Sequence, residues 1–209
     1  MKLLNYMKKI LNYGELFEAK ARNWEGFTIG EHTETVLRVF EDTFENSVPQ
    51  DLCPFIKFII INHDIGKGLA YYRGTNQEYE NENECKRLFS KLNVSKKVQD
   101  LLLYLIIHSQ YYTTSYYVKG NHLALKGLYN ECQKVLKEYM GVPPSANEIR
   151  GLMSICKILQ TCDSAAYTRY AITRDEKRGV YYKNGNDTFT ESFDKPKDIR
   201  GRKVSFKRK

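Results

Sequence analysis

The sequence predicts an all-α helical bundle that carries a small C-terminal β-hairpin and a basic tail. Most of the 209 residues fall in segments whose apolar positions repeat with the period of an α-helix. Residues 178–193 instead alternate around Asn184-Gly185, which is the pattern of a hairpin. A chain of this length is expected to form one main domain. We therefore assign residues 1–175 to the bundle and 176–209 to the hairpin and tail.

The first three predicted helices span residues 3–20, 31–47 and 50–64. The second is amphipathic, and its apolar face collects Val36, Val39, Phe40 and Phe44. The third is apolar on most sides, so we expect it to form the buried centre of the bundle. Its β-branched isoleucines would also suit a strand, but the helical pattern on either side favours a helix.

Four further helices are predicted at residues 78–93, 95–109, 121–140 and 145–172. Ser95 is expected to cap the N-terminus of the helix at residues 95–109. The helix at residues 121–140 is expected to end at Gly141, which is followed by two prolines. Ser145 and Glu148 have the spacing of a capping box at the start of the last helix.

Cysteine usage and hydropathy indicate a soluble cytoplasmic protein without a membrane partner. The chain has five cysteines and no C-x-x-C pair, which argues against a disulfide framework or a zinc ribbon: Cys53, Cys85, Cys132, Cys156 and Cys162. Residues 1–20 lack the continuous apolar region of a signal peptide. No apolar run is long enough to span a bilayer.

The net charge of +8 is concentrated at the C-terminus. Residues 195–209, which include Arg202 and Lys203, contain eight Lys or Arg and one Asp, so the rest of the chain is about neutral. A basic terminus on a neutral body suits contact with the phosphate backbone of a nucleic acid. A solvated tail without a specific role is an equally good interpretation.

A few residues have the chemistry of a metal site. The only histidines are His32, His63, His108 and His122. His63 and Asp64 end an apolar run, and Asp163 is a lone acid in an apolar stretch, where a carboxylate is costly unless it is paired or binds a cation. Together His32, His63, Asp64 and Asp163 form a mixed nitrogen and oxygen set that suits Mn²⁺, Fe²⁺, Ni²⁺, Co²⁺ or Zn²⁺. Taken alone, each of these residues is better interpreted as a hydrogen-bonded core histidine or a capping aspartate, and it is the order of the whole set that favours a metal site.

The order of these residues resembles the HD-domain metal-dependent phosphohydrolase superfamily over roughly residues 25–175. The matching segments are GEHTETV with His32, NHDIGKG with His63, Asp64 and Lys67, and TCDSAAYTRY with Asp163. That family is an α-helical bundle. The resemblance implies that the two histidines and two aspartates bind one ion, and that Asp64 interacts with the attacking water. It also implies that Lys67 lies beside the metal and helps to hold the substrate phosphate or the attacking water. We expect Gly66 and Gly68 to let the chain turn so that Lys67 faces the phosphate.

Two-metal members of this superfamily carry extra histidines between the His-Asp pair and the last Asp. The resemblance therefore implies that His108 binds a second metal or a phosphate, and that His122 is either a further ligand or a solvated residue at a helix start. We expect one or two divalent ions (Mn, Ni, Co, Fe or Mg) and hydrolysis of a phosphoester. The oxygenase chemistry of the family needs two irons with six ligands.

Two aromatic clusters bear on the substrate. Tyr71, Tyr72 and Arg73 follow Lys67, whereas His108 is followed by Tyr111, Tyr112, Tyr116 and Tyr117. Such rings beside cations suit unpaired bases, although tyrosine is also a common packing residue. With the tail, they favour single-stranded DNA or RNA as the substrate.

Ligand order and chain size are similar to those of the stand-alone Cas3-type HD nucleases of CRISPR interference, an antiviral defence. This similarity implies a separate helicase or another CRISPR effector subunit as a partner. Two alternatives stay open: a nucleotide phosphohydrolase acting on mononucleotides or on cyclic or signalling nucleotides, and a degenerate HD module that only binds.

Overall fold

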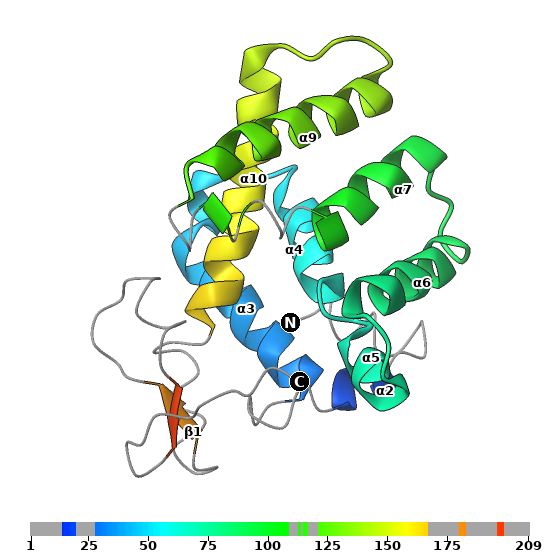
Figure 1. The fold of residues 1–209 in the computed structure, drawn as a ribbon, viewed down its shortest axis with the longest axis vertical. Helices are drawn as coiled ribbons and strands as arrows, with labels where there is room; N and C mark the ends of the chain where they lie inside the picture. The colour runs from blue at the N-terminus through cyan, green and yellow to red at the C-terminus, as the bar shows by residue number, and fades with distance from the viewer. Residues whose placement is uncertain are drawn as a thin grey trace.

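The computed structural model has an all-α body, in agreement with the predicted fold class (Figure 1). It describes residues 14–19, 28–108, 113, 115–116 and 121–166, and the backbone of 180–182 and 196–198. Of the predicted N-terminal helix, the described part contains α2 (Gly14–Glu18), and residues 3–13 lie outside it. None of the described helices combines the length and the apolar character that crossing a membrane requires.

Helix α3 (Ile29–Thr43) begins two residues before its predicted start at Glu31, and the short 3₁₀ helix η1 (Glu45–Ser47) follows it. Thr28 and Glu31 form a capping box, in which each side chain accepts a hydrogen bond from the other residue's backbone N–H. The capping residue therefore lies upstream of the segment that the apolar pattern marks. This cap fixes the rotation of the first turns of α3, and His32 faces inward with 1% of its surface exposed.

Helix α4 (Cys53–Asn62) is the buried centre that the sequence predicts. Four isoleucines on this helix have 1% of their surface exposed or less: Ile56, Ile59, Ile60 and Ile61. Pro54 lies in the first turn, where its missing N–H removes no hydrogen bond from the helix. Because apolar side chains hold α4 on several sides, the residues that follow its C-terminal end are held firmly in place.

A turn at residues 63–66 joins α4 to α5 (Lys67–Arg73), and α6 (Gln77–Phe89) follows. Gly66 has a φ of −89°, which any residue adopts, so the predicted conformational role of this glycine is wrong. The reason for the glycine is space: a Cβ there would lie 2.3 Å from the backbone nitrogen of Asn81. A Cβ at Gly68 would lie 2.5 Å from the Cβ of Ala19. Both glycines allow helices to pack closely.

The segment predicted as one helix at 95–109 has two parts. An α-helix, α7 (Lys96–Leu103), passes into a π-helix, η2 (Tyr104–His108). Ser95 occupies the N-cap position of α7, but its side chain makes no capping hydrogen bond, contrary to prediction. Single π-helical turns are rare and occur frequently at functional sites.

The last two helices of the bundle agree with the prediction at their caps. Helix α9 (Leu123–Met140) ends at Gly141, whose φ of 77° is the left-handed conformation that favours glycine. Helix α10 (Ala146–Ala165) begins with the predicted capping box of Ser145 and Glu148. Its predicted extension to residue 172 lies outside the described residues.

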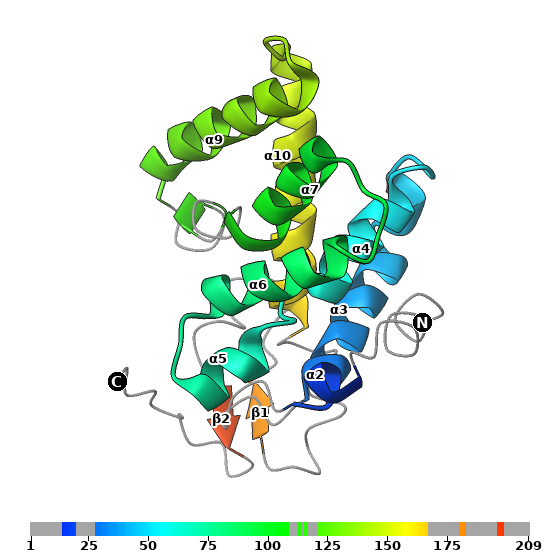
Figure 2. The same ribbon diagram turned by 90° about the vertical axis from the view of Figure 1, so that its right-hand side faces the viewer.

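Helix α10 runs through the middle of the bundle (Figures 1 and 2). It contacts α9 on one side and α3 and α4 on another, while α5 packs on α6 and α7 packs on α9. All five cysteines are buried and free.

Strands β1 (Val180–Tyr182) and β2 (Pro196–Asp198) pair antiparallel, with Val180 opposite Asp198. The partner of β1 therefore lies beyond the predicted hairpin segment 178–193. The predicted turn at Asn184-Gly185 lies outside the described residues, as do the division of domains at residue 175 and the rest of the tail.

Candidate metal centre

Three helix ends bring the predicted ligands together. His32 lies in the first turns of α3, His63 directly follows α4, and Asp163 lies in the last turn of α10. These three helices contact one another pairwise. The site lies at the C-terminal ends of α4 and α10, and the negative end of a helix dipole favours a cation.

His32, His63 and Asp163 form the core of the site. Their ligand atoms all lie within 4.8 Å of one another. The Nε2 atom of His32 is 2.9 Å from Oδ1 of Asp163 and 3.3 Å from Nε2 of His63. His63 Nε2 is in turn 3.4 Å from the same Asp163 oxygen. Two imidazole nitrogens and a carboxylate oxygen therefore converge on one point.

Asp64 lies beside this group, and other neighbours bind both of its oxygens. Its Oδ2 atom is 3.8 Å and 3.7 Å from the Nε2 atoms of His32 and His63. The same oxygen accepts a hydrogen bond of 2.8 Å from Lys67 Nζ, and Oδ1 accepts one of 2.7 Å from Gln77 Nε2. Asp64 is thus within reach of both imidazoles while its two oxygens are held by neighbours.

The tautomer of His63 follows from its backbone contact. Nδ1 lies 2.6 Å from the carbonyl oxygen of Ile60, which can only accept, so Nδ1 carries a proton and donates it. In the neutral imidazole the lone pair is then on Nε2, the atom that faces His32 and Asp163. An imidazole that donates through its other nitrogen to a backbone carbonyl has the usual orientation of a metal-binding histidine.

The electrostatics of the site favour positive charge. Burial alone would lower the pKa of His63, but Asp64 and Asp163 outweigh it and raise the pKa to about 9. Burial likewise opposes ionisation of the aspartates. Lys67 and the imidazoles nevertheless lower the pKa of Asp64 to about 2, and the two histidines lower that of Asp163. The raised pKa of His63 favours a proton on its imidazole in the metal-free protein.

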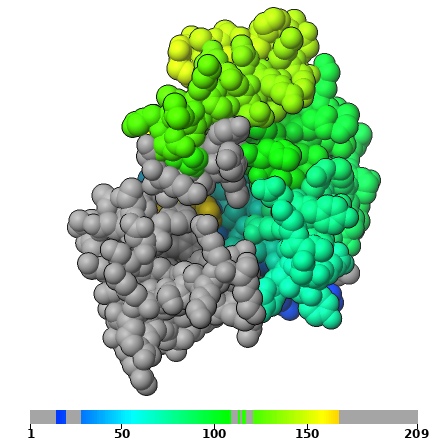
Figure 3. Space-filling view, viewed as in Figure 1, coloured from blue at the N-terminus to red at the C-terminus, as the bar shows by residue number. Residues whose placement is uncertain are grey.

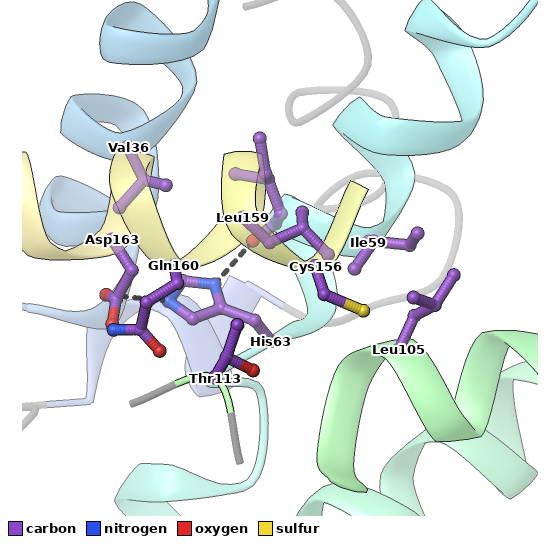
Figure 4. Close-up of a pocket in the computed structure, with 10 residues that line it drawn as sticks. Val36, Ile59, His63, Leu105, Thr113, Cys156, Leu159, Gln160 and Asp163 are labelled. Carbon is purple, nitrogen blue, oxygen red and sulfur yellow. Dashed lines mark hydrogen bonds and ion pairs between the residues drawn. The ribbon is translucent and has the colours of Figure 1, made fainter. Parts of the chain in front are cut away.

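A small cavity adjoins the group of ligands (Figure 4). Its volume is about 20 Å³, and His63 and Asp163 form part of its wall beside apolar side chains such as Val36 and Leu105. That volume suffices for one water-sized guest. A quarter of the side-chain surface of Asp163 is exposed. In Figure 3, golden atoms of the C-terminal part of α10 are visible in a gap between other segments. Donor set, charge and space therefore fit a single divalent ion held by His32, His63 and Asp163.

The other two histidines do not join this group. His108 is exposed at the end of η2, and His122 is exposed at the N-cap of α9, where its ring meets that of Tyr116 at 6.0 Å between centroids. Among the described residues, His32, His63 and Asp163 form the one group that could hold an ion. The second site that the resemblance implies at His108 and His122 stays a prediction.

The aromatic clusters are partly described. Tyr71 and Tyr72 of α5 expose 58% and 89% of their surface, and Arg73 beside them forms an ion pair with Glu80. Tyr116 is half-buried. Five other predicted nucleic-acid contacts lie outside the described residues: Tyr111, Tyr112, Tyr117, Arg202 and Lys203.

Two amide residues at the site were not predicted from the sequence, Gln77 and Asn81. Gln77 holds Asp64, and Asn81 donates to the carbonyl of His63 at 2.6 Å. A signal for Asn81 exists, because it lies one turn before Cys85 on the face of α6 that buries Cys85 and Leu88. Gln77 lies one further turn back on the same side. An uncharged amide on an apolar helix face indicates a polar partner inside the fold.

Comparisons with models of protein families, with curated proteins and with solved structures find no match to this chain. The structure thus defines an all-helical domain with a buried His/His/Asp cluster.

Proposed function

We propose that this chain is a metal-dependent phosphohydrolase of the HD type, and that it cleaves phosphodiester bonds of single-stranded nucleic acid. The observation that carries the proposal is the convergence of His32, His63 and Asp163 beside the Asp64–Lys67 pair. A divalent ion held by the first three residues, with Asp64 next to it, would make water acidic enough to supply hydroxide near neutral pH. Mn, Co, Ni, Fe and Mg are the ions to test.

The side chains around the ligands have distinct roles in this proposal. The lowered pKa of Asp64 keeps its carboxylate ionised 3.7 Å from His63, where it can accept a hydrogen bond from an attacking water and orient it. Lys67 supplies a fixed positive charge 2.8 Å from Asp64, which favours the negative charge that develops on a phosphoryl group. Lys67 is only 8% exposed, so it acts on a phosphate that enters the site rather than on the surface.

An open aromatic surface supports a polymeric substrate over a mononucleotide. Tyr71 and Tyr72 lie on α5, the helix that begins with Lys67, and both rings are largely exposed. Exposed tyrosines near a phosphate site suit stacking on successive unpaired bases. The basic residues 195–209 would add contacts to the phosphate backbone. A nuclease of the CRISPR interference type would work with a separate helicase.

The test is a substrate panel on metal-depleted protein. Mn²⁺, Co²⁺, Ni²⁺ or Mg²⁺ is added with single-stranded DNA, single-stranded RNA, or mononucleotides and cyclic nucleotides. We expect oligonucleotide cleavage that needs the ion and is lost in Asp64→Ala. Hydrolysis of nucleotides without cleavage of oligonucleotides would contradict the proposed nuclease and indicate a nucleotide phosphohydrolase. Binding without hydrolysis of any substrate would indicate a degenerate HD module.

Truncation of the tail tests the substrate class separately. Cleavage by the chain without residues 195–209 should weaken, and its decline with added salt should be shallower, because fewer counterions are released on binding. An unchanged salt dependence would show that the tail does not contact the phosphate backbone.

A further inference from the structure

A second, larger cavity lies at the start of α6. Its volume is about 370 Å³, within the range of pockets that bind small ligands. Residues 75–78 and Asn81 line one side, and Ile106 and Ile107 of the π-helix η2 line the other. The described residues that line this cavity are all different from those that line the small cavity beside His63.

The wall of this cavity is bonded to the turn that carries His63 and Asp64. Gln77 lines the cavity and donates to Asp64 Oδ1 at 2.7 Å. Asn81 donates to the carbonyl of His63 at 2.6 Å and accepts from the N–H of Gly66 at 2.7 Å. A group bound in the cavity would therefore lie one side chain away from Asp64.

The chemistry of the lining selects against a phosphate. Among the described residues, the polar lining contains amides, a hydroxyl and the Glu78 carboxylate, and no lysine or arginine. Glu78 would repel an anion. Its carboxylate and the amide oxygen of Gln77 accept no hydrogen bond from any described residue, so both can accept from a ligand. Ile106 and Ile107 lie behind this polar lining, with at most 3% of their surface exposed.

We propose that this cavity holds a nucleobase with an exocyclic amino group, next to the phosphate at the metal centre. Adenine and cytosine offer an amino donor to Glu78 or Gln77 together with a ring nitrogen that accepts from an amide, whereas thymine lacks the amino group. Gln77 is then a positioning residue shared by the base and Asp64. The inference rests on the proposed function for the position of the phosphate, and binding of the base can be measured without hydrolysis.

Binding is tested first, on metal-depleted full-length protein. Deoxycytidine, deoxyadenosine and thymidine, which carry no phosphate, are titrated at millimolar concentrations while backbone and side-chain amides are followed by NMR. We expect saturable shifts at Gln77, Glu78 and Asn81, with thymidine weaker by about tenfold or more, the usual loss for one hydrogen bond to a carboxylate. Absence of shifts at these residues with all three nucleosides would overturn the proposal.

A matched pair of variants tests the same site during turnover. The readout is the kcat/KM for oligodeoxycytidylate divided by that for bis(p-nitrophenyl) phosphate, a diester without a base. Glu78→Gln removes the acceptor charge with little change of shape and should lower this ratio about fivefold or more. Glu82→Gln makes the same change one turn along α6, where Glu82 pairs with Lys86, and should leave the ratio as in the wild type. Equal ratios in all three proteins would overturn the nucleobase site.

The two proposals fail in different ways. Nucleoside shifts without hydrolysis of any phosphodiester would support the base site and reject the proposed function. Metal-dependent hydrolysis of bis(p-nitrophenyl) phosphate without nucleoside shifts would keep the metal centre and reject the base site. Cleavage of oligonucleotides together with poor turnover of the corresponding mononucleotides would show that the base bound in the cavity belongs to a polymeric substrate.

Discussion

Gly66 and Asn81 lie in direct contact, with the Gly66 N–H donating to the Asn81 side-chain oxygen at 2.7 Å. The nitrogen of the same amide donates to the carbonyl of His63. One asparagine on α6 therefore holds both ends of the turn that carries His63 and Asp64. The orientation of the metal ligands depends on how closely α6 packs against that turn, and glycine at position 66 permits this packing.

Replacing Gly66 by alanine should disturb this packing. The new Cβ would lie 2.3 Å from backbone atoms of Glu80 and Asn81, so helix α6 or the turn has to move. We expect Gly66→Ala to lower the free energy of unfolding by about 1–3 kcal/mol, the usual cost of overpacking, and to weaken metal binding. Urea unfolding followed by circular dichroism measures the first effect and calorimetric titration with Mn²⁺ the second.

Gly151→Ala is the matched control. Gly151 lies in α10, and a Cβ there meets nothing within 4 Å, so alanine should stabilise the helix by about 0.5–1 kcal/mol. Equal stability of the two variants would contradict the close contact between Gly66 and α6.

Metal binding should stabilise the fold through Asp163. A ligand present at 100 times its dissociation constant adds about 2.7 kcal/mol to the free energy of unfolding. We expect Mn²⁺ to have an effect of this size on the wild type and almost none on Asp163→Asn, in which a neutral amide replaces the carboxylate. Thermal unfolding with and without Mn²⁺ provides the measurement. Asp100→Asn, which changes a surface residue paired with Lys96, should respond like the wild type. Full stabilisation of Asp163→Asn would rule out this ligand.

The metal-free protein should lose stability as the pH rises through the range in which His63 titrates. Burial opposes the charge, but Asp64 and Asp163 raise the pKa of His63 from 6.5 to about 9. The folded protein therefore holds the proton more tightly than the unfolded chain. This contribution is fully present below pH 6.5 and is lost as the pH approaches 9.

Urea unfolding of metal-depleted protein between pH 6 and 10 measures this loss. His63→Gln should show a much shallower decline, and His122→Gln, which changes an exposed histidine, should follow the wild type. Parallel curves for the wild type and His63→Gln would mean that another group causes the loss.

The sequence predicts the parts of this fold that depend on local pattern. Burial of α4 follows from its run of isoleucines, and the start of α10 follows from Ser145 and Glu148. The π-helix at Tyr104–His108 could not be predicted, because the apolar pattern continues through it. A shift from α-helical to π-helical hydrogen bonding depends on packing between helices, and it leaves no signature in residue order.

The candidate site, like the fold, could be predicted from the sequence only in part. The order of His32, His63 and Asp163 along the chain suggests a common site, and the fold brings their ligand atoms within 4.8 Å of one another. The orientation of Asp64 depends on Gln77, thirteen residues further along the chain. Such a contact forms only when α6 packs against the turn, so the sequence alone does not reveal it.

Removing the charge of Lys67 should make the metal-free protein more sensitive to acid. Lys67 Nζ donates to Asp64 Oδ2 at 2.8 Å, and both side chains are less than 10% exposed. Burial opposes ionisation of Asp64, and Lys67 is the first of the charges that lower the pKa of its carboxyl from 3.8 to about 2. A lowered carboxyl pKa contributes stability that is present above pH 3.8 and is lost as the pH falls toward 2.

Lys67→Met keeps the length of the side chain and removes this cation, so the pKa of Asp64 should rise and acid unfolding should begin at a higher pH. Circular dichroism between pH 2 and 5 gives the midpoint. Lys57→Met provides the control, because Lys57 pairs with Glu41 and Glu45 on more exposed surface, where loss of an ion pair has a small effect. A midpoint that moves no further in Lys67→Met than in Lys57→Met would show that the Lys67 charge does not hold Asp64 ionised.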